Sequence, residues 1–300
     1  MKDFDLSICV VTMNRADQLK EALESCLNCN LPENTEFVVI DNASTDNTKD
    51  VVYQTLETCG FDFYYEKLSE NLGVGGGRNY AFGKCSGRYI YVLDDDAVVS
   101  DGNLNFFKDA IEYFNKYDDI VTLTTQIYDT ALEDNRLNQI GKTVYDGLYF
   151  CKMFCGGSHF LRKSFFKEPP YLNNKYGYEE IPPSLYVTDA GMKNVFCPGL
   201  LIIHKPAMDK WDKTKKENIG ILINECATAY ALKKMIYPNI FSIVLKLAYY
   251  RRCSMYLKDK DSKRKANKLV KDIVKEYHGL KKIKIKTVIK EYKKFGIAVF

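Results

Sequence analysis

Three consecutive aspartates, Asp94, Asp95 and Asp96, directly follow the apolar run YIYVL. Adjacent carboxylates repel one another, so a plain solvated turn gains nothing from this density of charge. Carboxylates at the end of a buried strand suit Mg²⁺ or Mn²⁺, which bind one or two of them together with phosphate oxygens. The alternative is an acidic turn or a helix N-terminus that holds no ligand.

Other polar residues also stand where apolar runs end. Thr12 and Asn14 close the run in DLSICVVTMN, and Asp41 closes EFVVID. Amphipathic helical segments follow these runs, and strands that alternate with helices predict an α/β fold: a mostly parallel sheet flanked by helices. Because open α/β sheets bind ligands at the carboxyl ends of their strands, the aspartate triplet is expected to belong to a site.

The chain has an acidic body and a basic tail. From Lys205 onward it carries 25 Lys and Arg against 9 Asp and Glu, whereas the preceding residues carry 18 against 30. We expect a catalytic domain over residues 1–210 and a basic helical region over 211–300. A hydrophobic content of 46% excludes a disordered chain, and the sequence contains no signal peptide pattern and no apolar run of membrane-spanning length. These features predict a cytoplasmic protein whose ten cysteines are reduced.

A glycine cluster, Gly73 and Gly75 to Gly77, is followed by Arg78. It is not a dinucleotide fingerprint, since G-x-G-x-x-G would require glycine at position 78 and the cluster follows the third strand rather than the first. Glycines allow close approach of backbone to a ligand or to a helix. In the first case Arg78 is a cation for phosphate or ribose, and in the second the glycines only serve helix packing.

Six motifs occur in order: CVVTMNR, VVIDNASTDNT, NLGVGGGRN, YVLDDDAVV, CGGSHFLRK and YGYEE…GMKNVFCPGLLIIHK. Over about residues 5–206 the chain resembles the inverting, nucleotide-sugar-dependent glycosyltransferases of family 2, which have the GT-A fold. The resemblance implies a nucleotide-sugar site made of the following residues: Thr12, Asn14, Arg15, Asp41, Arg78, Asn79, Asp94, Asp95, Gly156 and Gly157. It also implies that Asp94 and Asp96 form the metal-binding D-x-D pair.

The resemblance further implies a catalytic base in the acidic pair Glu179-Glu180. By alignment Glu180 takes the base position, with Glu179 as the alternative, or both residues serve only the acceptor side or the structure. The pattern departs from the family here, because Pro182 and Pro183 follow the pair and Tyr186 stands where arginine is common. Glutamate is also one methylene longer than the usual aspartate, and the prolines are expected to reshape the turn.

His204 ends the run GLLIIH. In metal-dependent relatives a histidine here is a further metal ligand, which suits neutral imidazole beside two carboxylates. The alternative is a histidine that ends a strand and bonds to backbone. His159 is given no role, and Trp211 offers either an aromatic face to an acceptor sugar or core packing.

The resemblance implies an enzyme that uses Mn²⁺ or Mg²⁺ to move a sugar from a UDP- or dTDP-sugar to a hydroxyl of a glycan or lipid-linked glycan. Cell-surface polysaccharide or glycoprotein glycan synthesis is the expected setting. One alternative is an inactive nucleotide-sugar-binding or scaffold subunit. Another is a sugar-nucleotide pyrophosphorylase, but VVTMNRADQ lacks the glycine-rich, lysine-containing loop that such enzymes carry.

The lysine-rich helices after residue 211 interleave aromatics with cations. This pattern predicts peripheral, salt-sensitive association with an anionic membrane surface at the inner face of the membrane. The alternatives are helices packed on the catalytic domain and a homo-oligomer formed through the C-terminal region. Nucleic-acid binding is not expected, because no nucleic-acid-reading module accompanies the charge.

Overall fold

The computed structural model describes residues 4–136, 140–174, 177–206 and 218–300. The chain divides into two compact units. One consists of Met1–Glu180 and Gly191–Pro206, and the other of Ile181–Ala190 and Ala207–Phe300. The boundary expected at residue 210 lies outside the described residues, as does Trp211. The sequence-based division also placed residues 181–190 in the first domain, whereas here they group with the second unit.

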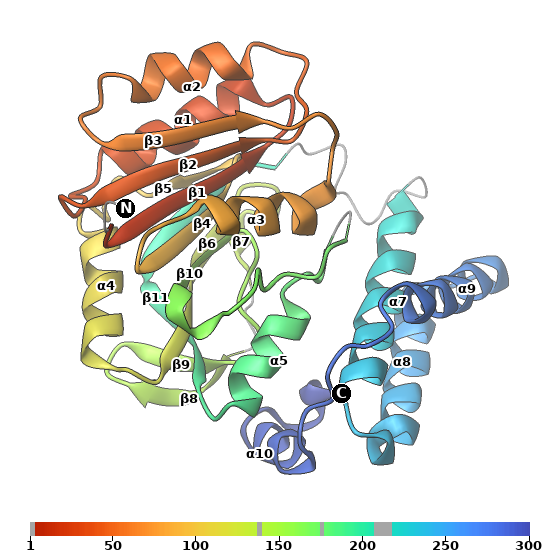
Figure 1. Cartoon of the computed structure of the whole chain (residues 1–300). Coiled ribbons are helices and arrows are strands. Elements are labelled where there is room, and N and C mark those ends of the chain that lie inside the picture. Colours follow the sequence, from red (N-terminus) through yellow and green to blue (C-terminus); the bar gives the residue numbers. More distant parts are fainter. Residues whose placement is uncertain (1–3, 137–139, 175–176, 207–217) are drawn as a thin grey trace. The chain divides into compact units, whose positions relative to one another are not determined.

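The first unit begins with alternating strands and helices, as the sequence predicts (Figure 1). The elements are β1 (Leu6–Thr12), α1 (Ala16–Leu27), β2 (Thr35–Asp41), α2 (Thr48–Leu56), β3 (Asp62–Lys67), α3 (Gly73–Lys84) and β4 (Tyr89–Asp94). Strands β3, β2, β1 and β4 lie side by side and are parallel. Strands β1 and β2 are buried almost throughout, which is why they read as continuous apolar runs.

Antiparallel strands extend the sheet beyond β4. The order is β3-β2-β1-β4-β10-β6-β11-β9-β8, with β5 paired to β11 and β7 paired to β6. The remaining elements of this unit are β5 (Ala97–Val99), α4 (Phe106–Lys116), β6 (Ile120–Asp129), β7 (Asp134–Asn135), β8 (Ile140–Tyr145), β9 (Leu148–Cys151), β10 (Ser158–Arg162), η1 (Lys163–Phe165) and β11 (Lys193–His204). Because β10 is antiparallel to both β4 and β6, and β11 is parallel to β6, strands β4, β6 and β11 end at the same edge of the sheet.

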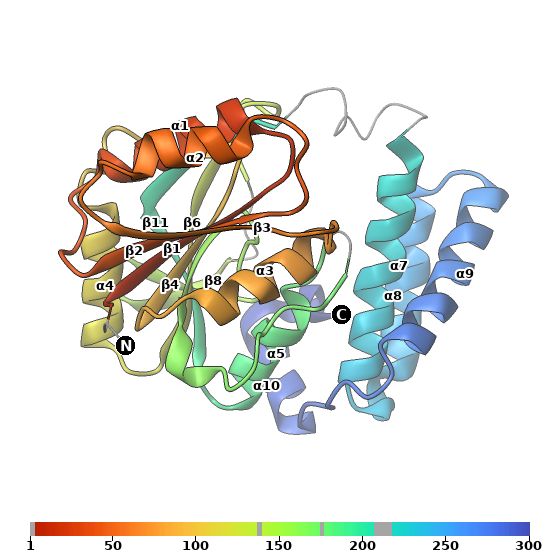
Figure 2. The same ribbon diagram turned by 45° about the horizontal axis from the view of Figure 1, so that its top comes forward.

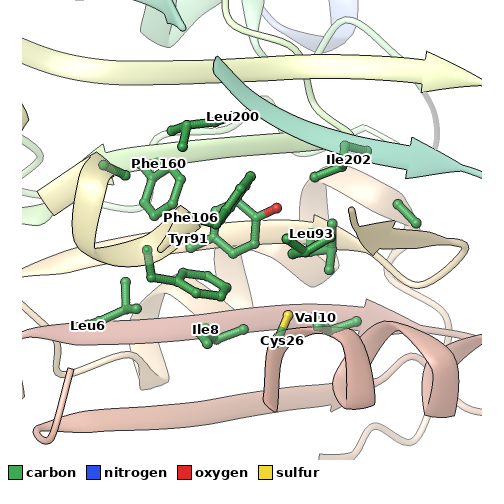
Figure 3. Close-up of a cluster of buried hydrophobic side chains, with 14 of the residues drawn as sticks. Leu6, Ile8, Val10, Cys26, Tyr91, Leu93, Phe106, Phe160, Leu200 and Ile202 are labelled. Carbon is green, nitrogen blue, oxygen red and sulfur yellow. The ribbon is translucent and has the colours of Figure 1, made fainter. Parts of the chain in front are cut away.

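Side chains that alternate along the strands build a core on each face of the sheet. Leu6, Ile8 and Val10 of β1 pack with α1, α2 and α4, whereas Cys9 packs with Ala81 and Phe82 of α3. Figure 2 shows α1 and α2 on one face and α3 on the other. Figure 3 shows aromatic rings of the larger cluster, where Tyr91, Phe106 and Phe160 contact one another. The ten cysteines are free thiols, as expected.

The stretch Lys193–His204, which contains Pro198 and Gly199, forms the single strand β11, with a register shift against β6 between Cys197 and Leu201. The glycine and proline within this stretch mark an irregularity of one strand and not a turn. Pro182 and Pro183 were expected to reshape a turn, yet they lie in the first turn of α5 (Ile181–Asp189). Backbone N–H groups have no helical partner there, so proline is tolerated.

The second unit is helical. It contains α5, α7 (Ile219–Ile236), η3 (Asn239–Phe241), α8 (Ser242–Tyr256), α9 (Lys260–Glu276), α10 (Ile285–Phe295) and η4 (Gly296–Val299). Side chains of α7, α8 and α9 share one apolar cluster. Asp189 at the end of α5 accepts hydrogen bonds from the backbone N–H of Lys284 and the hydroxyl of Thr287. Within the described residues, every helix is too short or too polar to cross a lipid bilayer.

Candidate active site

Asp94, Asp96 and His204 lie together at the carboxyl edge of the sheet. Each offers one ligand atom, and these atoms lie within 4.8 Å of one another. The Nε2 atom of His204 is 3.2 Å from Oδ1 of Asp96. Two carboxylates and an imidazole fit Mn²⁺, and the carboxylates alone also suit Mg²⁺. The partners of His204 are side chains, so the alternative of a ring bonded only to backbone does not describe this site.

Two residues that the sequence reading missed hold the other side of His204. Its Nδ1 atom is 3.1 Å from Oδ2 of Asp129 and 2.8 Å from Nη2 of Arg136. Arg136 also donates from Nε to Asp129 at 2.8 Å. A signal for Asp129 was present, because it ends strand β6 as Asp41 ends β2 and Asp94 ends β4. The position of Arg136, seven residues later, carries no such signal.

Arg15 joins the second and third aspartates of the triplet. Its Nη1 atom donates to Oδ1 of Asp95 at 2.8 Å and to Oδ2 of Asp96 at 2.7 Å. The hydroxyl of Thr12 donates to the other oxygen of Asp95 at 2.8 Å. Burial raises the pKa of Asp95 to about 6, although Arg15 and Thr12 oppose this shift. The structure therefore brings Thr12, Arg15, Asp95 and Asp96 together, as expected.

Arg78 connects the aspartate triplet to the acidic pair. Its Nη2 donates to Asp94 at 2.6 Å and its Nη1 to Glu179 at 2.5 Å, while Glu180 lies 3.7 Å away. The side chain of Arg78 is only 5% exposed. Burial disfavours a charged Asp94, but attraction to Arg78 and His204 outweighs it and holds the pKa of Asp94 below its ordinary value.

Glu179 and Glu180 differ in their surroundings. Glu179 is tied to Arg78 through Oε1, and its backbone carbonyl accepts from the N–H of Leu172. Glu180 makes a longer contact to Arg78, at 3.7 Å. Burial, together with repulsion from Glu179, raises the pKa of Glu180 to about 8 against the attraction of Arg78. A carboxyl group with a pKa near the working pH is suited to accept a proton.

Gly156 and Gly157 line the same site. A Cβ at Gly156 would lie 1.9 Å from Oε1 of Glu180 and 2.7 Å from Nη1 of Arg78, and one at Gly157 would lie 3.1 Å from Oδ2 of Asp94. Glycine at 156 therefore lets Glu180 and Arg78 approach the backbone. The contact with donor sugar expected for these glycines stays a prediction.

Asp41 and Asn14 lie in the adjoining turns. Asp41 is 1% exposed and accepts from the hydroxyl of Tyr65 at 2.8 Å and from the N–H of Ser44 at 2.6 Å. Asn14 has a left-handed backbone, φ 53°, and its side-chain oxygen accepts from the N–H of Thr45. These bonds join the turns after β1 and β2 into one wall. A carboxylate oxygen accepts more than one bond, so Asp41 retains capacity for a ligand.

Asn79 and the glycines before it are bound to a distant loop. Asn79 exchanges two hydrogen bonds with the backbone of Tyr171, at 2.8 and 2.9 Å. A Cβ at Gly75 would lie 1.9 Å from the carbonyl oxygen of Leu172, so only glycine fits there. The packing interpretation therefore describes this part of α3, and a nucleotide contact of Asn79 stays a prediction. His159, which received no role, bonds to Tyr171 and to the carbonyl of Cys155.

The sequence of this chain is similar to those of known glycosyltransferases. Residues 7–174, more than half of the chain, match the model of Glycosyl transferase family 2. The minor teichoic acid biosynthesis protein GgaB of Bacillus subtilis is 27% identical over 45% of this chain and 15% of its own length. The GalNAc(5)-diNAcBac-PP-undecaprenol beta-1,3-glucosyltransferase of Campylobacter jejuni is 31% identical over 33% of this chain and 32% of its own. The chain thus matches less than a third of the length of these two relatives.

Solved structures of similar fold cover nearly the whole chain. TarS 1–349 of S. aureus in complex with UDP-GlcNAc has a TM-score of 0.62 at 13% identity, over 95% of this chain and 83% of that one. The mannosyltransferase PcManGT of Pyrobaculum calidifontis, in complex with GDP-Man and Mn²⁺, has a TM-score of 0.58 at 13% identity, over 96% and 79%. These likenesses show the expected GT-A fold. The family-model match over residues 7–174 establishes that the chain belongs to glycosyl transferase family 2.

Proposed function

We propose that this chain is a metal-dependent, inverting glycosyltransferase that moves a sugar from a UDP- or dTDP-sugar to a hydroxyl of a glycan or lipid-linked glycan. One observation carries the proposal. The ligand group Asp94, Asp96 and His204 lies at the same sheet edge as Glu180, and Arg78 contacts both Asp94 and Glu180. Solved structures of similar fold, in complex with UDP-GlcNAc or with GDP-Man and Mn²⁺, support a nucleotide-sugar donor and the metal. Relatives named for teichoic acid and poly-beta-1,6-N-acetyl-D-glucosamine synthesis support a polysaccharide setting.

The residues of this site divide the chemistry between them. Asp94, Asp96 and His204 would hold Mn²⁺ or Mg²⁺, which when bound stabilises charge on the departing diphosphate. The acceptor oxygen forms a bond to the anomeric carbon while the bond from that carbon to the diphosphate breaks. The hydroxyl proton passes to the carboxylate of Glu180. Attack from the face opposite the leaving group inverts the anomeric configuration.

Arg15 is the better placed of the two arginines to meet the donor phosphates. Its side chain is 32% exposed, whereas that of Arg78 is 5% exposed and already pairs with Asp94 and Glu179. A guanidinium offers five donors, so Arg15 can hold Asp95 and Asp96 and still donate to phosphate. Arg78, in this proposal, sets the spacing between the metal-ligand carboxylates and the acidic pair, in place of the phosphate contact expected from the sequence.

A panel of nucleotide sugars tests the function. Purified protein is incubated with each UDP-, dTDP- and GDP-sugar, with Mn²⁺ or with chelator, and release of nucleoside diphosphate is measured. The proposal expects metal-dependent release from a UDP- or dTDP-sugar, and NMR of a transferred product should show the inverted anomer. Absence of release from every donor would favour the inactive binding subunit, which calorimetry with UDP would then detect.

A further inference from the structure

Helix α8 presents a row of apolar side chains to solvent. One side of the helix is buried through Leu245, Tyr249 and Cys253, and the last two pack in the cluster shared with α7 and α9. The opposite side of α8, together with Ile240 of η3, forms what we call the α8 outer face. Its members and their exposed fractions are Ile240 (72%), Ile243 (74%), Leu247 (63%) and Tyr250 (48%).

The spacing of these four residues is that of one helical face, because they follow one another by three, four and three positions. Single exposed apolar residues are common on soluble proteins and need no explanation. A continuous apolar row is different, since contiguous exposed patches mark surfaces that meet a partner or a membrane. The partner of this face must therefore offer apolar surface.

The charged residues in the segment that carries the face are all positive, and one of them, Arg252, lies 3.8 Å from Glu225 of α7. Lys246 and Arg251 are exposed on α8, and residues 238–258 hold four cations, Lys246, Arg251, Arg252 and Lys258, without any aspartate or glutamate. The partner must therefore also be anionic. A second copy of this face fails that requirement, because symmetric pairing would bring the cations of one segment against those of the other, and residues 238–258 contain no carboxylate to compensate them.

We propose that the α8 outer face docks on an anionic lipid bilayer, with α8 lying in the plane of the interface. Ile243 and Leu247 would enter the boundary between headgroups and acyl chains, Tyr250 would lie at headgroup level, and Lys246 and Arg251 would meet lipid phosphates. A convex face of one helix suits a bilayer better than a protein groove. The proposal gives a location to the membrane association expected from the basic tail, and it does not depend on glycosyl transfer.

A second exposed row provides a matched control. On α10, Ile285, Ile289 and Tyr292 are 45–49% exposed and also have lysines beside them. Their side chains are less exposed than those of Ile240, Ile243 and Leu247. In addition, α10 contains the carboxylate of Glu291, whereas α8 contains none. If any apolar row of this unit sufficed for lipid binding, substitutions in α10 would weaken it as much as substitutions in α8.

The experiment is co-flotation of the full 300-residue chain with vesicles of phosphatidylcholine alone or with phosphatidylserine. We expect the protein to bind only the vesicles that contain phosphatidylserine, and we expect this binding to weaken as the salt concentration rises. The double variant Ile243→Gln/Leu247→Gln should bind at least about tenfold more weakly. Lys246→Gln/Arg251→Gln should bind about 25-fold more weakly, since each of its two cations contributes roughly fivefold near an anionic surface. Ile285→Gln/Ile289→Gln should bind like wild type. Circular dichroism confirms that each variant folds.

Several results would overturn the proposal. These are no binding of the wild type to phosphatidylserine vesicles, equal binding by the Ile243→Gln/Leu247→Gln variant, and an equal loss in the α10 variant. A wild type that is dimeric by light scattering, and becomes monomeric only in the Ile243→Gln/Leu247→Gln variant, would assign the face to a second copy instead.

Discussion

Asp129 lies 3.1 Å from Nδ1 of His204, on the opposite side of the ring from Asp96. The two nitrogens of a neutral imidazole differ, because one carries the proton and the other a lone pair. If Nδ1–H donates to Asp129, the lone pair of Nε2 points toward the carboxylates of the ligand group. If Arg136 donates to Nδ1 instead, the proton sits on Nε2 and blocks the metal. Asp129 is therefore a positioning residue for His204.

Asp129→Asn should weaken Mn²⁺ binding by about 10- to 100-fold, the usual cost of losing a hydrogen-bond partner of a ligand. Binding is measured by electron paramagnetic resonance of free Mn²⁺, so no activity is needed. Asp118→Asn, which removes an exposed carboxylate of the same unit, is the matched control. Unchanged Mn²⁺ affinity in Asp129→Asn would show that the ring needs no such support.

Glu180→Gln should lower kcat by roughly 10²- to 10⁴-fold with donor KM nearly unchanged, because glutamine keeps the shape and loses the basicity. Glu179→Gln should cost less in kcat. Glu179→Gln removes one ion pair of Arg78, but Arg78 stays in contact with Asp94 and Glu180, so the base itself remains in place. Steady-state kinetics with the preferred donor measures both. A loss confined to Glu179→Gln would move the base one residue back.

Glu180 should also make stability depend on pH. Its pKa of about 8 in the folded protein lies above the ordinary glutamate value of 4.5, because burial and Glu179 oppose the charge and outweigh Arg78; Asp94 adds a smaller repulsion. A raised carboxyl pKa gives a contribution to stability that is complete below about pH 4.5 and is lost as pH rises toward 8. The melting temperature of Glu180→Gln, relative to wild type, should therefore increase between about pH 5 and pH 8. A constant difference across that range would contradict the raised pKa.

Gly156→Ala should displace Glu180 and Arg78, since the new Cβ would overlap Oε1 of Glu180. A shift of about 1 Å in a reacting group costs on the order of 100-fold in rate, so kcat should fall by about that factor. Gly83→Ala in α3 is the control. A Cβ there meets nothing within 4 Å, and alanine in a helix adds about 0.5–1 kcal/mol of stability. Wild-type turnover by Gly156→Ala would mean that the loop yields freely.

The parts of the site that the sequence predicted share a simple signal. Thr12, Asp41 and Asp94 end apolar runs, and strand ends of a parallel sheet converge on one edge whatever the details of packing. The same rule would have found Asp129. The contacts of Arg78 with both Asp94 and Glu179 could not be predicted. Arg78 and Glu179 are 101 positions apart in the sequence, and their contact depends on how the loops pack.

The same limit explains the glycines and prolines. Gly75 looked like part of a ligand loop, but its small size serves the carbonyl of Leu172, almost a hundred residues away. Local sequence shows that a glycine is needed without showing what approaches it. Pro182 and Pro183 were expected to reshape a turn, but proline is also compatible with the first turn of a helix, and they lie in the first turn of α5, which groups with the C-terminal helices.

The most direct test of the account is the initial rate of sugar transfer as a function of Mn²⁺ concentration, for wild type, Asp96→Ala and the exposed-site control Asp101→Ala. The account predicts a saturating metal dependence for wild type and for Asp101→Ala, abolished by excess chelator. It predicts a loss of at least about 10³-fold in Asp96→Ala at every Mn²⁺ concentration, with the fold intact, because a metal ligand is removed and no core volume is lost. Full transfer in excess chelator, or by Asp96→Ala, would contradict the metal site at this edge of the sheet.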